Sequence, residues 1–67
     1  MEKKLYFAAH EWNENDGVIV IHFYADSLFD AILKAEHQFR KAYELPDLDF
    51  NSMDGGILTV DEVNIYE

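Results

Sequence analysis

The sequence predicts an α+β domain in which one helix packs on one face of a small, mainly antiparallel sheet. Residues 3–10 alternate between two faces, as a strand does, and residues 18–25 are rich in β-branched and aromatic residues. A single amphipathic stretch follows at 28–43. A third apolar stretch at 57–66 completes the order ββαβ. We expect one compact domain over residues 1–67 with a thin core, because a chain this short buries only about 60% of its unfolded surface.

The first two stretches are expected to form a hairpin, because the segment between them, NENDG, is dense in turn formers. We predict that Phe7 pairs with Phe23, which places Ala9 opposite Ile21 on the same face. Period-two alternation then fixes the other face. That face would consist of Tyr6, Ala8, His10, Trp12, Val18, Val20, His22 and Tyr24. A single helix covers one face, so this second face is expected to stay open.

The helix is predicted to begin after Ser27, whose hydroxyl can cap it with Asp30 as the acidic partner of a capping box. Asp26 is the alternative cap. Two favourably ordered i,i+4 ion pairs are expected, Asp30 with Lys34 and Glu36 with Arg40. The apolar stripe predicted to face the sheet is Leu28, Ala31, Ile32, Ala35, Phe39, Ala42 and Tyr43. Pro46 should end the helix.

The C-terminal third is expected to be a loop followed by a strand. We predict that Leu48, Phe50 and Met53 lie under the end of the helix. The alternation of the last strand breaks at Asp61 and Glu62, and a bulge there would restore it. Alternatively, DGG closes a small hairpin, only 62–66 joins the main sheet, and the sheet gains a fourth strand.

Charge is the most unusual property of this chain. Fourteen Asp and Glu against five Lys and Arg give a net charge of −9. Residues 44–67 contain seven carboxylates and no basic residue, and the predicted turn adds Glu11, Glu14 and Asp16. Such a field repels nucleic acid and anionic lipid and attracts basic surfaces, although the same excess also serves solubility.

No pattern in the sequence indicates catalysis or metal binding. Asp47, Asp49 and Asn51 have the spacing that opens a calcium loop, but Ser52 and Leu58 replace its turn glycine and its bidentate glutamate. The three histidines lack ligand spacing, the serines have no triad partners, and the chain has no cysteine. We therefore expect no catalytic residue, no metal and no cofactor, and a protein that is not an enzyme.

Neither a signal peptide nor an apolar run of about 20 residues is present, so we expect a soluble cytoplasmic protein that does not bind membranes.

One segment, YADSLFDAILKAEHQF at 24–39, resembles the strand-to-helix unit of the gene-two-product family of T-seven-like coliphages. The likeness rests on Tyr24, Ala25, Asp26, Ser27, Leu28, Asp30, Ala31, Ala35, Glu36, Gln38 and Phe39. With the two preceding strands, the similar order covers about two-thirds of the chain. The family consists of small ββαβ inhibitors of host RNA polymerase. Its last strand carries arginines that contact the polymerase, and Glu62 and Asn64 stand at the equivalent positions here.

The resemblance and the charge together imply a phage-type inhibitor that binds a basic, nucleic-acid-binding surface of a bacterial protein. RNA polymerase and CRISPR effectors are the expected targets, in the host cytoplasm, by steric block and mimicry of nucleic-acid charge. HicB-like antitoxins share a similar hairpin and helix, so an antitoxin-like or regulatory homodimer through the open face is the alternative. The residues expected to bind the partner are Glu11, Glu14, Asp16, Asp47, Asp49, Asp54, Asp61, Glu62, Tyr6, Trp12 and Tyr24.

Overall fold

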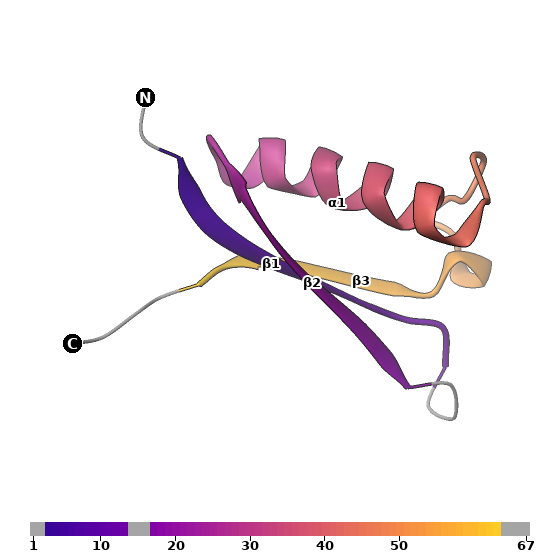
Figure 1. Cartoon of the computed structure of the whole chain (residues 1–67). Helices are drawn as coiled ribbons and strands as arrows, with labels where there is room; N and C mark the ends of the chain where they lie inside the picture. Colours follow the sequence, from indigo (N-terminus) through magenta and orange to yellow (C-terminus); the bar gives the residue numbers. More distant parts are fainter. Residues whose placement is uncertain (1–2, 14–16, 64–67) are drawn as a thin grey trace.

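The computed structural model describes residues 3–13 and 17–63, and in them one α-helix lies across one face of an antiparallel sheet (Figure 1). The elements are β1 (Lys4–Glu11), β2 (Val18–Ala25), α1 (Leu28–Tyr43), the short 3-10 helix η1 (Met53–Gly55) and β3 (Ile57–Glu62). The predicted α+β class and the ββαβ order are confirmed.

The sheet has the order β2-β1-β3, so that β1 pairs antiparallel with both neighbours. Its β3 ladder is regular from Ile57 opposite Glu11 to Glu62 opposite Tyr6. The Val63 N–H continues it by donating to the Leu5 carbonyl at 2.9 Å. The predicted bulge and the alternative small hairpin are therefore both wrong in the described part of the chain, which forms three strands. Residues 64–67 of the predicted last strand lie outside it.

The predicted hairpin register is wrong by one residue. Tyr6 lies opposite Phe23 and Phe7 opposite His22. A one-residue shift turns every side chain of one strand to the other face. The residues of β1 expected on the open face, Tyr6, Ala8 and His10, consequently point toward α1 and are buried.

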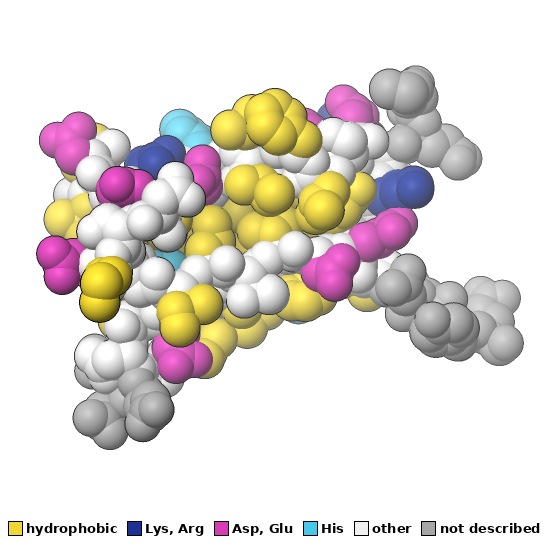
Figure 2. Space-filling view, turned by 180° about the vertical axis from the view of Figure 1, so that it is seen from behind, with side chains coloured by type: hydrophobic (Ala, Val, Ile, Leu, Met, Phe, Trp, Pro, Cys, Tyr) yellow, Lys and Arg dark blue, Asp and Glu magenta, His cyan; other side chains and the backbone are white. Residues whose placement is uncertain are grey.

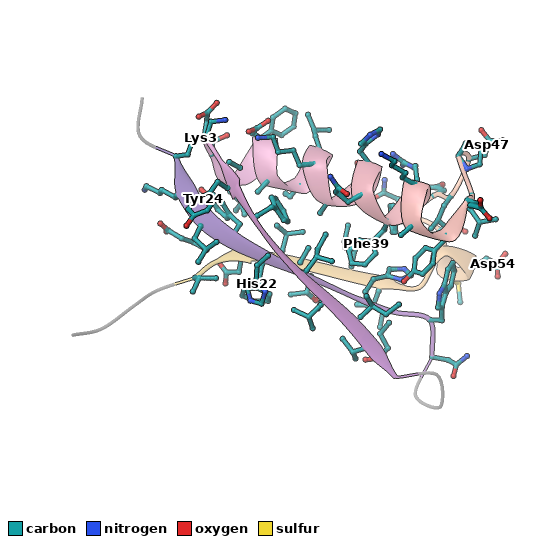
Figure 3. All side chains as sticks on the ribbon, viewed as in Figure 1. Lys3, His22, Tyr24, Phe39, Asp47 and Asp54 are labelled. Carbon is teal, nitrogen blue, oxygen red and sulfur yellow. The ribbon has the colours of Figure 1, made fainter. Side chains whose placement is uncertain are left out.

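The physical reason for this register is the space that the helix needs. Ala8 packs with Ala35 and Phe39, and Phe39 is only 1% exposed (Figure 3). The other face of β1 would present Phe7 at this depth and leave no room for the Phe39 ring. Of the predicted helix stripe, Ala31, Ala35 and Phe39 are buried, and Ile32 and Tyr43 are half-buried. Leu28 and Ala42 are exposed, which corrects the prediction at those two positions.

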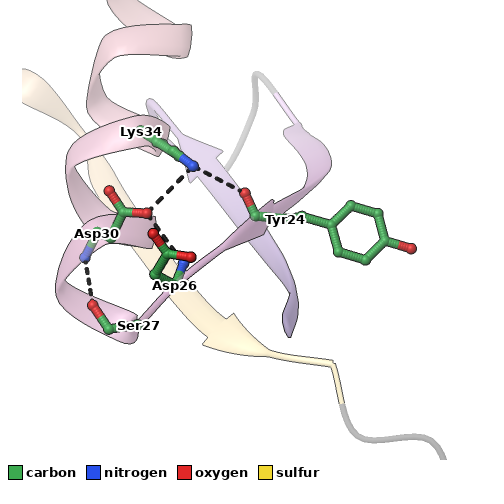
Figure 4. Close-up of polar contacts among 5 residues, drawn as sticks. All are labelled: Tyr24, Asp26, Ser27, Asp30 and Lys34. Atoms are coloured by element: carbon green, nitrogen blue, oxygen red, sulfur yellow. Dashed lines mark hydrogen bonds and ion pairs between the residues drawn. The ribbon is translucent and has the colours of Figure 1, made fainter. Parts of the chain in front are cut away.

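The start of α1 is fixed by polar contacts, of which the sequence predicts the Ser27 cap and the Asp30–Lys34 ion pair. Ser27 is the N-cap: its hydroxyl accepts from the Asp30 N–H at 3.2 Å. The Asp30 carboxylate in turn accepts from the Asp26 N–H at 3.2 Å and lies 3.3 Å from Lys34 Nζ (Figure 4). Lys34 Nζ also donates to the Tyr24 carbonyl at 3.2 Å, which ties the helix to β2.

The end of α1 holds the following loop. Glu44 adopts a left-handed conformation with φ of 57°, and the Leu45 N–H donates to the Arg40 carbonyl at 3.0 Å, which closes the helix before Pro46. Arg40, expected to pair with Glu36, instead donates its Nε–H to the Leu48 carbonyl at 2.8 Å. Its guanidinium lies 5.3 Å from the centroid of the Phe50 ring. Leu48 and Phe50 are half-buried as predicted, whereas Met53 is fully exposed.

Candidate binding surfaces

The sheet face that α1 does not cover presents alternate residues of all three strands, and we call it the open sheet face. Across the sheet these residues form rows, such as His22, Phe7 and Asp61, because each residue of β1 has a partner on both sides. The face consists of Leu5, Phe7, Ala9 and Glu11 from β1, Val18, Val20, His22 and Tyr24 from β2, and Ile57, Thr59 and Asp61 from β3.

Most of the open sheet face is apolar and accessible to solvent. Tyr24 is 61% exposed, Ile57 is 67% exposed, and about half of each of Val18 and Val20 is exposed. His22 points away from the helix on the same side (Figure 3). An antiparallel sheet with one solvated face usually presents polar residues there. A contiguous apolar face of this kind instead marks a contact surface.

The strand residues of this face carry two charged side chains, Glu11 and Asp61, and both are carboxylates. Asp61 is exposed, and its Oδ1 accepts from the Glu62 N–H at 2.8 Å. Glu11 is half-buried at the turn end of β1. The face therefore combines apolar contact area with negative charge, which suits a partner surface that is apolar and basic.

Three of the residues expected to bind a partner lie on the open sheet face, namely Tyr24, Glu11 and Asp61. Two others do not, because β1 is turned over. Tyr6 is 4% exposed and packs with Ala25 and Ala31 in the core. Trp12 is half-buried on the helix side, with its ring edge-on to His10 at a centroid distance of 4.7 Å.

The remaining predicted carboxylates do not form one cluster with this face. Asp47 and Asp54 lie at the end of the molecule opposite Tyr24 (Figure 3). Asp49 lies in the same loop and accepts from the Asn51 N–H at 2.9 Å, which stabilises the turn. Glu62 is on the helix side, where its carboxylate lies 3.8 Å from Lys4 Nζ. Glu14 and Asp16 are outside the described residues.

A buried histidine is the polar centre of the core, and the sequence did not predict it. His10 is 1% exposed and lies among the rings of Trp12, Phe39, Tyr43 and Phe50. Its Nε2 donates to the Gly55 carbonyl at 2.7 Å, since a carbonyl oxygen only accepts. In the neutral ring, Nδ1 then accepts from the Tyr43 hydroxyl at 2.9 Å. Burial raises the pKa of Tyr43, so that the hydroxyl keeps its proton.

The role of His10 is structural, because both ring nitrogens are engaged. Its hydrogen bonds connect β1 to the last turn of α1 and to η1. Gly56 completes the arrangement: with φ of 78°, it lies so close that an added Cβ would be 2.8 Å from His10 Nε2. The one sequence signal for this packing is the glycine pair 55–56 just before the last strand. In the described part of the chain, no group of three or more His, Asp or Glu could hold a metal ion.

A second candidate surface, partly apolar and also missed by sequence reasoning, lies between α1 and β3, and we call it the α1–β3 groove. It contains a hollow of about 280 Å³ lined by Ile32, Glu36, Phe50, Asn51, Leu58 and Val60. Hydrophobic side chains gather between the helix and the strand below it (Figure 2). The signal available in the sequence was the pair Phe29 and Leu33, two apolar residues outside the predicted stripe.

Comparison with known proteins identifies no relative: no protein-family description, curated protein or solved structure matches this chain. Among the described residues, no helix is long and apolar enough to cross a membrane. A functional interpretation therefore depends on the surfaces described above.

Proposed function

We propose that this protein is a binding module that inhibits a bacterial nucleic-acid-binding protein by docking on its basic surface. The observation that supports this most directly is the open sheet face, an exposed apolar surface whose strand residues carry carboxylates as their only charges. The net charge of −9 acts in the same direction. It favours encounter with a basic surface and opposes direct binding of nucleic acid.

In this proposal the two parts of the face have different roles. Val20, Tyr24 and Ile57 supply the buried apolar contact area, and tyrosine in particular is enriched among the residues that dominate binding energy. Glu11 and Asp61 occupy positions on the partner that nucleic-acid phosphates would otherwise take. The inhibitor thus acts by steric block and charge mimicry in the bacterial cytoplasm, and it needs no reaction of its own.

The sequence resemblance makes bacterial RNA polymerase the first partner to test, and the small size and acidity of the chain add a CRISPR effector as the second. Glu62 stands where the resembling family carries an arginine. Glu62 lies on the helix side beside Lys4, so this difference leaves the open sheet face unchanged.

Affinity measured by surface plasmon resonance for RNA polymerase holoenzyme and for a guide-loaded CRISPR effector tests the proposal. Tyr24→Ala should weaken binding to the true partner about 30-fold, as expected for a central aromatic anchor worth roughly 2 kcal/mol. Met53→Ala is the control, because Met53 is fully exposed in η1, next to Asp54 at the end of the molecule opposite Tyr24, and should leave affinity unchanged. If the protein binds neither RNA polymerase nor the CRISPR effector, the open sheet face does not serve this function. Equal affinities of Tyr24→Ala and Met53→Ala would show the same.

The second candidate function is an antitoxin-like homodimer that pairs two open sheet faces. The apolar character of the face favours it, because two sheets can bury such faces against each other. The net charge of each copy opposes it. Sedimentation equilibrium separates the candidates: a dimer that Tyr24→Ala converts to a monomer supports self-association, whereas a monomeric parent protein excludes it.

A further inference from the structure

The outer edge of β3 has main-chain groups available for pairing. Because the Val63 N–H donates to the Leu5 carbonyl, alternation turns the polar groups of Leu58, Val60 and Glu62 away from β1. The Glu62 N–H is already taken by Asp61 Oδ1. Across residues 3–13 and 17–63, no group hydrogen-bonds to the outward N–H or C=O of Leu58 or Val60.

The side chains of the same two residues line the α1–β3 groove. Leu58 and Val60 point to the helix side, where Ile32 and Phe50 complete the apolar wall of the hollow. A volume of about 280 Å³ is below the usual range for a small-molecule site, roughly 300–1,000 Å³. It suits one or two side chains of a peptide. Strand edge and side-chain pocket thus occur together.

Residues of α1 form the other wall of the α1–β3 groove. Lys34 donates a hydrogen bond to the Tyr24 carbonyl, so the side of α1 that carries Lys34 lies next to β2. The opposite side of the helix therefore faces β3. This flank carries Ile32 and Glu36 in the hollow itself. Phe29, which is 72% exposed, and Leu33, which is 50% exposed, lie one turn or less away on the same flank. Figure 2 shows the hydrophobic side chains above and below the hollow.

The other edge of the sheet differs. The outward main-chain groups of β2 belong to Val18, Val20, His22 and Tyr24, and Lys34 already covers the Tyr24 carbonyl. The side chains of these residues point to the open sheet face, away from the helix. A strand added at β2 would therefore pair next to side chains that point away from the helix. At β3, the stretch 58–60 lacks the charges, prolines and bulges that usually protect an edge strand.

We propose that the β3 edge and the α1–β3 groove bind an extended basic segment of a partner protein, which adds to the sheet as a fourth strand. Main-chain bonds to Leu58 and Val60 set its position, and alternate apolar side chains enter the hollow. The segment is basic because its side chains that do not enter the hollow point to the other face of the sheet, beside the exposed carboxylate of Asp61. The strand edge and the hollow lie outside the apolar part of the open sheet face, so this inference does not depend on the proposed inhibitor function, although Asp61 borders both surfaces.

A second copy of this chain is the less suitable occupant. Antiparallel pairing of two β3 strands centred on Val60 would place Glu62 of each copy beside Leu58 of the other. That carboxylate would enter the hollow lined by Glu36, with no cation among the residues that line it. Each copy also carries a net charge of −9, so like charges oppose the approach.

The test uses a capped peptide of seven residues that alternates lysine with valine, titrated into the isotope-labelled protein and followed by NMR. Shifts of amide resonances should concentrate at Leu58 and Val60 and at Ile32 in the groove. A peptide that alternates glutamate with valine should bind at least about tenfold more weakly, because charge complementarity is lost. Shifts confined to the open sheet face or to β2, or equal binding of both peptides, would overturn the proposal.

A matched pair of synthetic proteins then tests the edge itself. An N-methyl group on the Val60 amide removes one outward donor and blocks strand addition, while it leaves the bonds to β1 intact. Affinity for the lysine–valine peptide should fall about tenfold or more, equivalent to roughly 1.4 kcal/mol. An N-methyl group on the Val20 amide, which is also outward but on β2, should change affinity less than about twofold. Equal effects of the two methyl groups would contradict the proposal.

Two further outcomes are informative. Tyr24→Ala should leave peptide affinity unchanged, so that loss of the open-face function and loss of the groove function can be told apart. A dimer in sedimentation that the Val60 methyl group dissociates would show that the edge takes a second copy, and it would overturn the choice of a basic partner segment.

Discussion

The imidazole of His10 connects three parts of the chain that are far apart in sequence. Its partners are the Tyr43 hydroxyl, 33 residues away, and the Gly55 carbonyl, 45 residues away. A buried ring nitrogen that loses its partner carries the full cost of desolvation. The hydroxyl of Tyr43 therefore contributes to stability through His10 as well as through its own contacts.

Tyr43→Phe tests this contribution. The substitution removes the hydroxyl and leaves His10 Nδ1 buried without its partner, so the free energy of unfolding should fall by about 1–3 kcal/mol. Urea denaturation measures it. Tyr24→Phe provides the matched control, because that hydroxyl belongs to a side chain that is 61% exposed and should cost almost nothing to remove. Equal stabilities of the two variants would show that the His10 network is energetically unimportant.

The stability that Asp30 gives to the start of α1 depends on pH. Its carboxylate accepts from the Asp26 N–H and lies beside Lys34, and these contacts hold its pKa below the ordinary value of 3.8. The folded pKa lies below the unfolded one, so the stabilisation is complete above about pH 4 and is lost as the pH falls through the folded pKa. Asp30→Asn should flatten the loss of stability below about pH 4, as measured by urea denaturation at several pH values. Parallel pH profiles of parent and variant would contradict this.

Residues with local partners were the predictable ones. Ser27 caps the helix as expected, because its hydroxyl bonds to the N–H of Asp30, only three residues away. The Asp30 carboxylate accepts from the Asp26 N–H, a contact that the capping-box pattern did not predict. The role of His10 could not be predicted, because its partners come from the helix end and from the loop before β3. The need for glycine at position 56 could not be predicted for the same reason, because it arises from the close approach of the distant His10 ring.

At the scale of elements, the bounds of α1 and β2 agree with prediction, but the partner face of β1 does not. Both faces of β1 are apolar: Leu5, Phe7 and Ala9 on one side compete with Tyr6 and Ala8 on the other. Alternation alone gives no preference between them. The face of β1 that packs on the helix is determined by Phe39, whose buried ring requires a small residue beneath it. This requirement depends on tertiary packing and cannot be inferred from the alternation of β1 alone.

Phe39→Ala tests the packing of helix on sheet. Phe39 is 1% exposed and contacts Ala8 and Ala35, so its truncation should cost about 3–5 kcal/mol in the free energy of unfolding. Phe29→Ala removes the same ring from the same helix at a position that is 72% exposed and should cost less than about 0.5 kcal/mol. Thermal and urea denaturation measure both. If Phe39→Ala melts together with Phe29→Ala, the helix does not pack as described.

For the molecule as a whole, most of the described carboxylates lie away from the open sheet face. The loop after α1 carries Asp47, Asp49 and Asp54 at one end, and Tyr24 lies at the other (Figure 3). The sequence predicts the amount of negative charge but not its placement, which depends on how the sheet and loop orient each strand. Placement is what matters for recognition, because Glu11 and Asp61 are the described carboxylates that lie on the open sheet face.

Salt dependence separates recognition by charge from acidity that serves solubility. Charges near a binding face act mainly on the association rate, and exposed charges are screened beyond about 8 Å at physiological ionic strength. Association with a basic partner should therefore slow steeply between about 50 and 500 mM salt, while dissociation changes little. The double variant Glu11→Gln with Asp61→Asn should weaken this slope.

The control double variant, Asp47→Asn with Asp54→Asn, removes the same charge from the distant loop and should retain most of the slope. Stopped-flow measurements of the association rate on the parent and the two double variants test this prediction. In a separate experiment, nucleic acid that the partner binds should compete with the parent protein. An association rate that is flat across this salt range would mean that the net charge of −9 has no part in recognition. Equal slopes of the two double variants would assign the effect to net charge alone, and would remove the open sheet face from the electrostatic mechanism.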